Sequence, residues 1–89
     1  MYKEDIDRRI NNSVNWLNTI DPNWLYKVDT KTLDMTNNCI LDQVFGNYED
    51  AIETYPQLKD KNDGKLYTFA GHTQDWKDKI NTLKGVNNE

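Results

Sequence analysis

The fold is decided by one stretch in mid-chain, residues 39–55, which reads CILDQVFGNYEDAIETY. Its apolar residues recur at steps of three and four, the spacing that places side chains on one face of an α-helix. They are Leu41, Val44, Phe45, Tyr48, Ile52 and Tyr55. The opposite face carries Gly46 and the acidic residues Asp42, Glu49, Asp50 and Glu53. The spacing predicts a central amphipathic helix over residues 38–55, which ends before Pro56.

Two further helices are predicted on either side of this stretch. Residues 3–20 repeat apolar side chains at helical spacing, and Pro22 ends the pattern. Residues 73–84 do the same, with Thr73 as the predicted N-cap and Gly85 as the stop. Three amphipathic helices of this kind are expected to share one core.

The connecting segments allow a short two-stranded β-ribbon. Residues 26–30 alternate loosely between apolar and polar side chains, and residues 65–69 could form the pairing strand. The sequence Asn62-Asp63-Gly64 is typical of a tight hairpin turn. The predicted fold class is mainly α: one three-helix small domain over residues 1–89 that allows this ribbon, with a frayed tail from residue 86.

Composition limits the classes of protein to which the chain can belong. Its 89 residues include 11 basic and 15 acidic side chains, which give a net charge of -4. Without a basic run, direct nucleic-acid binding is not expected. The single cysteine excludes an internal disulfide framework and is typical of a reducing compartment. With no apolar run of about 20 residues and no signal peptide, we expect a cytoplasmic protein without membrane contact.

The sequence contains no recognisable catalytic constellation. Cys39 falls in the first turn of the central helix, where the helix dipole can lower a thiol pKa, but a nucleophilic cysteine also needs a base. His72 is the only histidine, and no spacing argument brings it to Cys39. Asp60, Asn62 and Asp63 resemble part of a calcium loop without its later glutamate. We therefore expect a buried Cys39 and a protein that is not an enzyme, with no cofactor and no metal.

Seven residues are candidates for a partner-binding surface: Trp16, Trp24, Asp42, Gly46, Glu49, Asp50 and Glu53. The four carboxylates would share the outer face of the central helix, where Gly46 lets another backbone approach. Trp16 and Trp24 are the aromatic residues expected at the surface, because tryptophan is common in binding hot spots. Two plainer interpretations stay open: the acidic face is only solvated, and the rings fill a core that is short of aliphatic side chains.

Several residues follow a recurring pattern: Asp29, Thr32, Leu33, Asp34 and Met35, then Cys39, Leu41, Gln43, Val44, Phe45, Gly46 and Tyr48, and finally Thr73 and Trp76. This pattern resembles a motif of small uncharacterised proteins from phages and prophages of Gram-positive bacteria. Asp42 departs from the motif, which has a small residue at that position. The resemblance implies an accessory protein of a phage or mobile element, of a kind that binds and blocks host factors, including defence systems.

The acidic balance, the lack of catalytic chemistry and this resemblance lead to a first hypothesis, a non-enzymatic protein that binds and inhibits a host protein in the host cytoplasm. A second hypothesis is a protein that binds or sequesters a nucleotide signal, with a tryptophan or tyrosine stacked on the base. Lys65, or Arg8 with Arg9, would then contact the phosphate. The surplus of aromatic residues also allows a homodimer.

Overall fold

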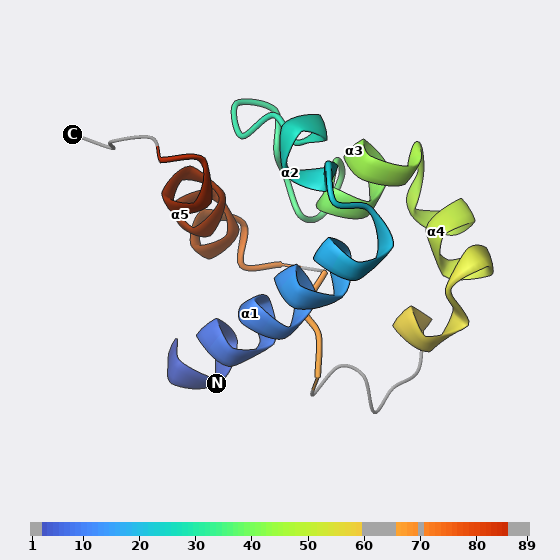
Figure 1. The fold of residues 1–89 in the computed structure, drawn as a ribbon, viewed down its shortest axis with the longest axis horizontal. Coiled ribbons are helices and arrows are strands. Elements are labelled where there is room, and N and C mark those ends of the chain that lie inside the picture. Colours follow the sequence, from blue (N-terminus) through green and yellow to red (C-terminus); the bar gives the residue numbers. More distant parts are fainter. Residues whose placement is uncertain (1–2, 60–65, 70, 86–89) are drawn as a thin grey trace.

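The computed structural model describes residues 3–59, 66–69 and 71–85, and its mainly α-helical architecture confirms the predicted fold class. The elements, in chain order, are α1 (Lys3–Ile20), α2 (Trp24–Lys27), α3 (Ile40–Phe45), α4 (Tyr48–Thr54), the 3-10 turn η1 (Pro56–Lys59) and α5 (Thr73–Lys84). Figure 1 shows α1 across the middle of the molecule, with α5 and α4 at opposite edges.

The first and last predicted helices are observed with the predicted bounds, α1 over residues 3–20 and α5 over residues 73–84. At the end of α5, Gly85 has a φ of +74°, the left-handed conformation that often closes a helix. Thr73 is the first residue of α5, whereas its predicted role was the N-cap. Its hydroxyl accepts a hydrogen bond from the backbone N–H of Met35 at 3.0 Å, which ties the loop before α3 to α5.

The predicted central helix is divided in two. α3 ends at Phe45, and the next residue, Gly46, has a φ of +96° and a ψ of -44°, which lie outside the helical region. The next residue, Asn47, is extended, and its side-chain oxygen accepts a 2.7 Å hydrogen bond from the backbone N–H of Asp50, which caps α4. A glycine stop followed directly by an asparagine cap therefore interrupts the helix, although the apolar spacing continues across both residues.

The described residues form no β-ribbon. The short helix α2, residues 24–27, includes the first two residues of the strand predicted over residues 26–30, and residues 66–69 form no ladder. The side chain of Gln43 contacts the backbone after α2, where its oxygen accepts a 2.7 Å hydrogen bond from the N–H of Asp29. Among the described residues, β-bridging is confined to an isolated pair between Asp34 and Asn38. The predicted hairpin turn over residues 62–64 and Lys65 lie outside the described residues.

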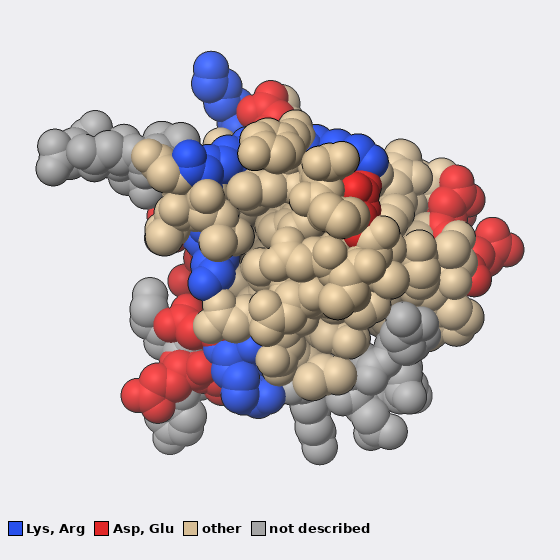
Figure 2. All heavy atoms as spheres, in the orientation of Figure 1, with Lys and Arg blue, Asp and Glu red and all other residues tan. Residues whose placement is uncertain are grey.

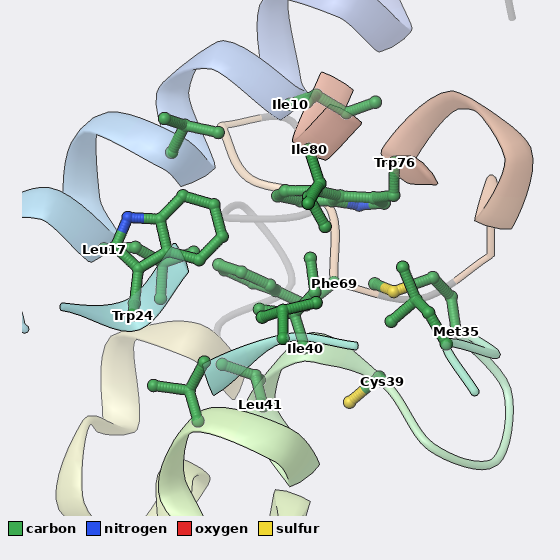
Figure 3. Close-up of a cluster of buried hydrophobic side chains, with 14 of the residues drawn as sticks. Ile10, Leu17, Trp24, Met35, Cys39, Ile40, Leu41, Phe69, Trp76 and Ile80 are labelled. Atoms are coloured by element: carbon green, nitrogen blue, oxygen red, sulfur yellow. The ribbon is translucent and has the colours of Figure 1, made fainter. Parts of the chain in front are cut away.

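The core lies between α1, α5, α2 and α3 (Figure 3). Its completely buried side chains come from elements far apart in the chain, and the largest are Leu17, Trp24, Ile40, Leu41, Trp76 and Ile80. Full burial of one large apolar side chain contributes about 1.5–3 kcal/mol, so these few residues supply much of the stability of so short a chain.

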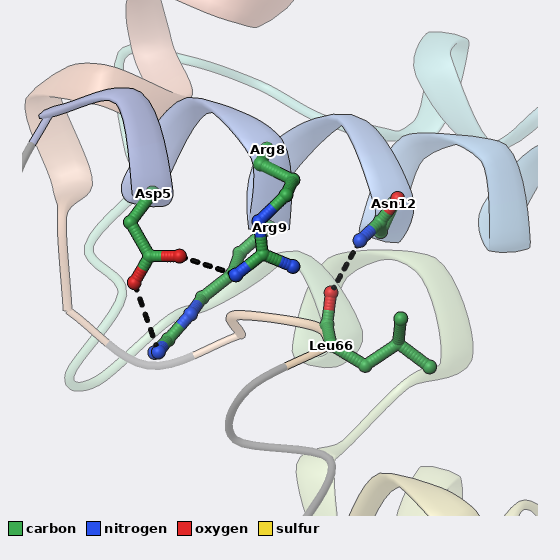
Figure 4. Close-up of polar contacts among 5 residues, drawn as sticks. All are labelled: Asp5, Arg8, Arg9, Asn12 and Leu66. Carbon is green, nitrogen blue, oxygen red and sulfur yellow. Dashed lines mark hydrogen bonds and ion pairs between the residues drawn. The ribbon is translucent and has the colours of Figure 1, made fainter.

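The segment over residues 66–69 is held against α1 and α5 by hydrogen bonds. The hydroxyl of Ser13 is completely buried, donates to the carbonyl of Arg9 at 2.8 Å and accepts from the N–H of Thr68 at 3.0 Å. The indole N–H of Trp76 donates to the carbonyl of Thr68 at 3.0 Å. One residue before Ser13 on α1, the side-chain amide of Asn12 donates to the carbonyl of Leu66 at 3.1 Å (Figure 4). These bonds satisfy both backbone groups of Thr68 and the carbonyl of Leu66 where the irregular segment passes next to the core.

Within residues 3–59, 66–69 and 71–85, none of the helices combines the length and the apolar character that a membrane crossing requires.

Candidate functional site

The two tryptophans expected at the surface are buried, so the prediction of their exposure is wrong. Trp24 is 1% exposed, and its indole N–H donates to the side-chain oxygen of Asn18 at 2.7 Å. Trp16 is 9% exposed and lies at the centre of an aromatic cluster. Its ring centroid is 5.2–6.2 Å from those of Phe45, Tyr55, Tyr67 and Phe69. Both rings therefore supply core volume, as the plainer interpretation predicted.

Asp42 does not face a partner freely, because its carboxylate holds the joint between α3 and α4. One oxygen accepts a hydrogen bond from the N–H of Cys39 at 3.1 Å, at the start of α3. The other accepts from the N–H of Tyr48 at 2.6 Å, at the start of α4. Both N–H groups belong to the set that a helix start leaves without an intrahelical partner. Asp42 therefore sets how α4 is placed relative to α3.

Gly46 serves the same joint. A Cβ at this position would meet no atom within 4 Å among the described residues, so close packing does not explain the glycine. The positive φ of Gly46 explains the glycine, because other residues rarely adopt that backbone conformation. Asp42 and Gly46 thus position α4, and the acidic surface predicted over the whole central helix is reduced to α4 itself.

Helix α4 carries the remaining candidates on its outer side. Glu49, Asp50 and Glu53 are exposed, and Figure 2 shows acidic side chains projecting from the edge of the molecule that α4 forms. Tyr48 is 44% exposed and Ile52 is half-buried. These five residues line a shallow hollow of about 400 Å³ on the surface, which we call the α4 face.

The negative charge of the α4 face is not neutralised by the described residues. The ion pairs among them join Asp5 to Arg8 and Arg9, and Asp21 to Lys27, all outside α4. Glu49 and Glu53 lie one turn apart on α4, a spacing at which like charges repel. The last turn of α4 contains no basic residue. The α4 face therefore offers carboxylates to a partner together with an apolar strip.

Cys39 is 4% exposed, as predicted for a buried thiol. Burial raises its pKa, and the nearby carboxylate of Asp42 adds to the rise, so the thiolate is disfavoured despite the helix start. In the part of the chain that the structure describes, no cluster of His, Cys, Asp and Glu side chains could hold a metal ion. The suggested calcium residues Asp60, Asn62 and Asp63 lie outside the described residues.

Within the part of the chain that the structure describes, the residues suggested for a nucleotide site do not line one pocket. Arg8 and Arg9 both contact the carboxylate of Asp5 (Figure 4), and Lys65 lies outside the described residues. A hollow of about 320 Å³ is lined by Asn12, Asn15, Trp16, Thr19, Leu66 and Tyr67, without a cation among them. A second hollow of about 290 Å³, between α1 and α5, has three carboxylates, those of Asp7, Asp75 and Asp78, and one cation, Lys79, in its lining, so acidic groups outnumber basic ones there.

Sequence reasoning missed Tyr48 and Ile52 as surface residues, because the continuous helix assigned both to its buried face. The pair Gly46-Asn47 was the available signal, since glycine commonly follows a helix and asparagine commonly precedes one.

Comparison of the chain with protein-family models, with curated proteins and with solved structures found no match.

Proposed function

We propose that this chain is a non-enzymatic protein-binding domain that binds and inhibits a host protein through the α4 face. The observation that carries the proposal is the pairing of the exposed ring of Tyr48 and the half-buried Ile52 with three carboxylates that no described cation neutralises. The resemblance to small phage and prophage proteins supports the host partner, which we place among bacterial factors that include defence components.

Several properties favour recognition of a protein over recognition of a small molecule. The hollow on the α4 face is shallow and open, whereas small-molecule sites are concave and enclose most of their ligand. A partly exposed tyrosine that lies on a helix and is bordered by polar groups is typical of an interface hot spot. Burial raises the pKa of the Cys39 thiol, which disfavours the thiolate that a nucleophilic cysteine needs.

Affinity capture from the lysate of a Gram-positive host tests this proposal. The tagged chain should retain one dominant protein, and the double variant Tyr48→Ala, Ile52→Ala should lose it. The matched control is Tyr26→Ala, which removes a tyrosine that is 83% exposed on α2, away from the α4 face. Circular dichroism should show both variants folded.

The purified partner then allows a test of inhibition. Adding the chain should lower the activity of the partner, and the double variant should have no effect at the same concentration. Loss of the captured protein in Tyr26→Ala but not in the double variant, or capture of no protein at all, would refute the proposed use of the α4 face.

A further inference from the structure

We propose that the α4 face recognises a cationic amphipathic segment of the partner, in which lysine or arginine side chains flank an apolar one. This inference rests on the proposed function and specifies the chemistry of the partner.

Two parallel rows of side chains on α4 define the shape of that segment. Tyr48 and Ile52 are four residues apart and form an apolar row, while Glu49 and Glu53 form an acidic row beside it. Residues four apart on a helix have Cβ atoms about 5–6 Å apart. Cationic side chains with matching separation occur at i and i+4 of a helix, or at i and i+2 of an extended strand. The apolar side chain of the segment would pack on the Tyr48 row.

The charge of the α4 face selects a cation as the complementary group. Asp50 accepts a hydrogen bond from the side-chain amide of Asn47 at 3.1 Å, but no described cation lies within ion-pair distance of it. Glu49 and Glu53 likewise have no ion-pair partner among the described residues. A partner cation would relieve the repulsion between them, so binding gains electrostatic energy that the free domain lacks.

The same charges argue against two other occupants. A second copy of the chain, related by twofold symmetry, would bring the acidic rows together and repel. A nucleic acid would place phosphates against the carboxylates. The experiment below detects both alternatives: the first as self-association of the domain, and the second as displacement of the peptide by an oligonucleotide.

The probe is a short synthetic peptide of lysine, leucine and alanine, with lysines at i and i+4 and leucine at i+3, so that all three side chains lie on one side of a helix. A control peptide replaces each lysine with glutamate. Titration into the isotope-labelled domain, followed by NMR, should shift the amides of α4 with the lysine peptide only. Raising the salt concentration should weaken this binding, because exposed charge pairs are screened.

Matched variants locate the charge effect. Glu49→Gln and Glu53→Gln should each weaken peptide binding by about two- to fivefold, the value of one exposed ion pair. Asp78→Asn removes the same charge from the exposed side of α5 and should leave the affinity unchanged. Equal weakening by all three variants, binding of the glutamate peptide, self-association through α4 or displacement by an oligonucleotide would overturn the inference.

The captured partner distinguishes this inference from the proposed function. If capture depends on Tyr48 and Ile52 but is unaffected by Glu49→Gln, Glu53→Gln and salt, the partner-binding function stands and the cationic segment is wrong. If no Tyr48-dependent partner exists, the proposed function fails, whatever the peptide does.

Discussion

Replacing Gly46 with alanine tests the division of the central helix, because two arrangements of the chain predict opposite signs. In a continuous helix over residues 38–55, Gly46→Ala would stabilise the protein by about 1 kcal/mol, the difference in helix propensity between the two residues. In the structure described here, Gly46 has a φ of +96°, so the alanine is strained and the variant is destabilised.

The magnitude follows from the surroundings of Gly46. The new Cβ meets no described atom within 4 Å, so neither a clash nor a packing gain contributes. The backbone conformation is the remaining contribution. An alanine in the left-handed helical region costs about 1–2 kcal/mol, and a ψ of -44° at the φ of Gly46 lies outside even that region. We therefore expect a loss of about 2 kcal/mol, within the range of roughly 1–3 kcal/mol for a residue in a rarely populated region.

Urea denaturation followed by circular dichroism measures the difference in the free energy of unfolding between variant and wild type. In thermal denaturation, the melting temperature should fall by roughly 8–16 °C for a chain of this size. Gly85→Ala is the matched control, since its φ of +74° and ψ of 20° close α5 in either arrangement. It should cost about 1 kcal/mol. A Gly46→Ala protein that is as stable as the wild type, or more stable, would refute the interrupted helix and with it the orientation of the α4 face.

Three further predictions concern charge and the buried thiol. Glu53→Lys should raise the melting temperature by about 4–8 °C, because it replaces repulsion from Glu49 with attraction and places a cation in the last turn of α4, which together contribute about 1 kcal/mol. The same variant should weaken binding of the lysine peptide. An unchanged melting temperature at low salt would contradict this prediction. Cys39 should react with a thiol reagent only as fast as the protein opens, whereas fast labelling of the native state would contradict its burial. Hydrogen bonds, chiefly from the side chain and backbone of Thr36, lower the pKa of Asp34 in the folded state, so its stabilising effect is present at neutral pH and lost as the pH falls below about 4. Asp34→Asn should flatten that acid limb in urea midpoints measured against pH, and an identical limb in the variant would refute this role.

The outer helices were predictable because local signals agree with the apolar spacing. The pattern of α1 runs unbroken to the residues before Pro22, and that of α5 stops at Gly85, so periodicity and end signals coincide. In the central stretch they conflict. Val44, Tyr48 and Ile52 keep helical spacing across the break, and periodicity alone cannot show that the backbone turns between them.

The candidate site depended on information that the sequence holds only weakly. A tryptophan at the edge of an apolar stripe fits both a core and a surface position, and the burial of Trp16 becomes evident only when four other rings surround it. The backbone N–H of Asp29 donates to the side chain of Gln43, fourteen residues away, a contact that apolar spacing does not predict. Of the carboxylates predicted at the site, Glu49, Asp50 and Glu53 are exposed on one helix, whereas Asp42 is part of the joint.

The position of α4 at the edge of the fold has a consequence for how the domain can be re-engineered. α4 packs against α3 and η1, and its one buried residue, Ala51, points away from the α4 face. Exchanges at positions 48, 49, 50, 52 and 53 therefore leave the central packing of α1, α2 and α5 intact. A library randomised at these five positions should yield mostly folded proteins with new binding preferences, so the domain can serve as a compact scaffold whose specificity is reprogrammed on a single helix.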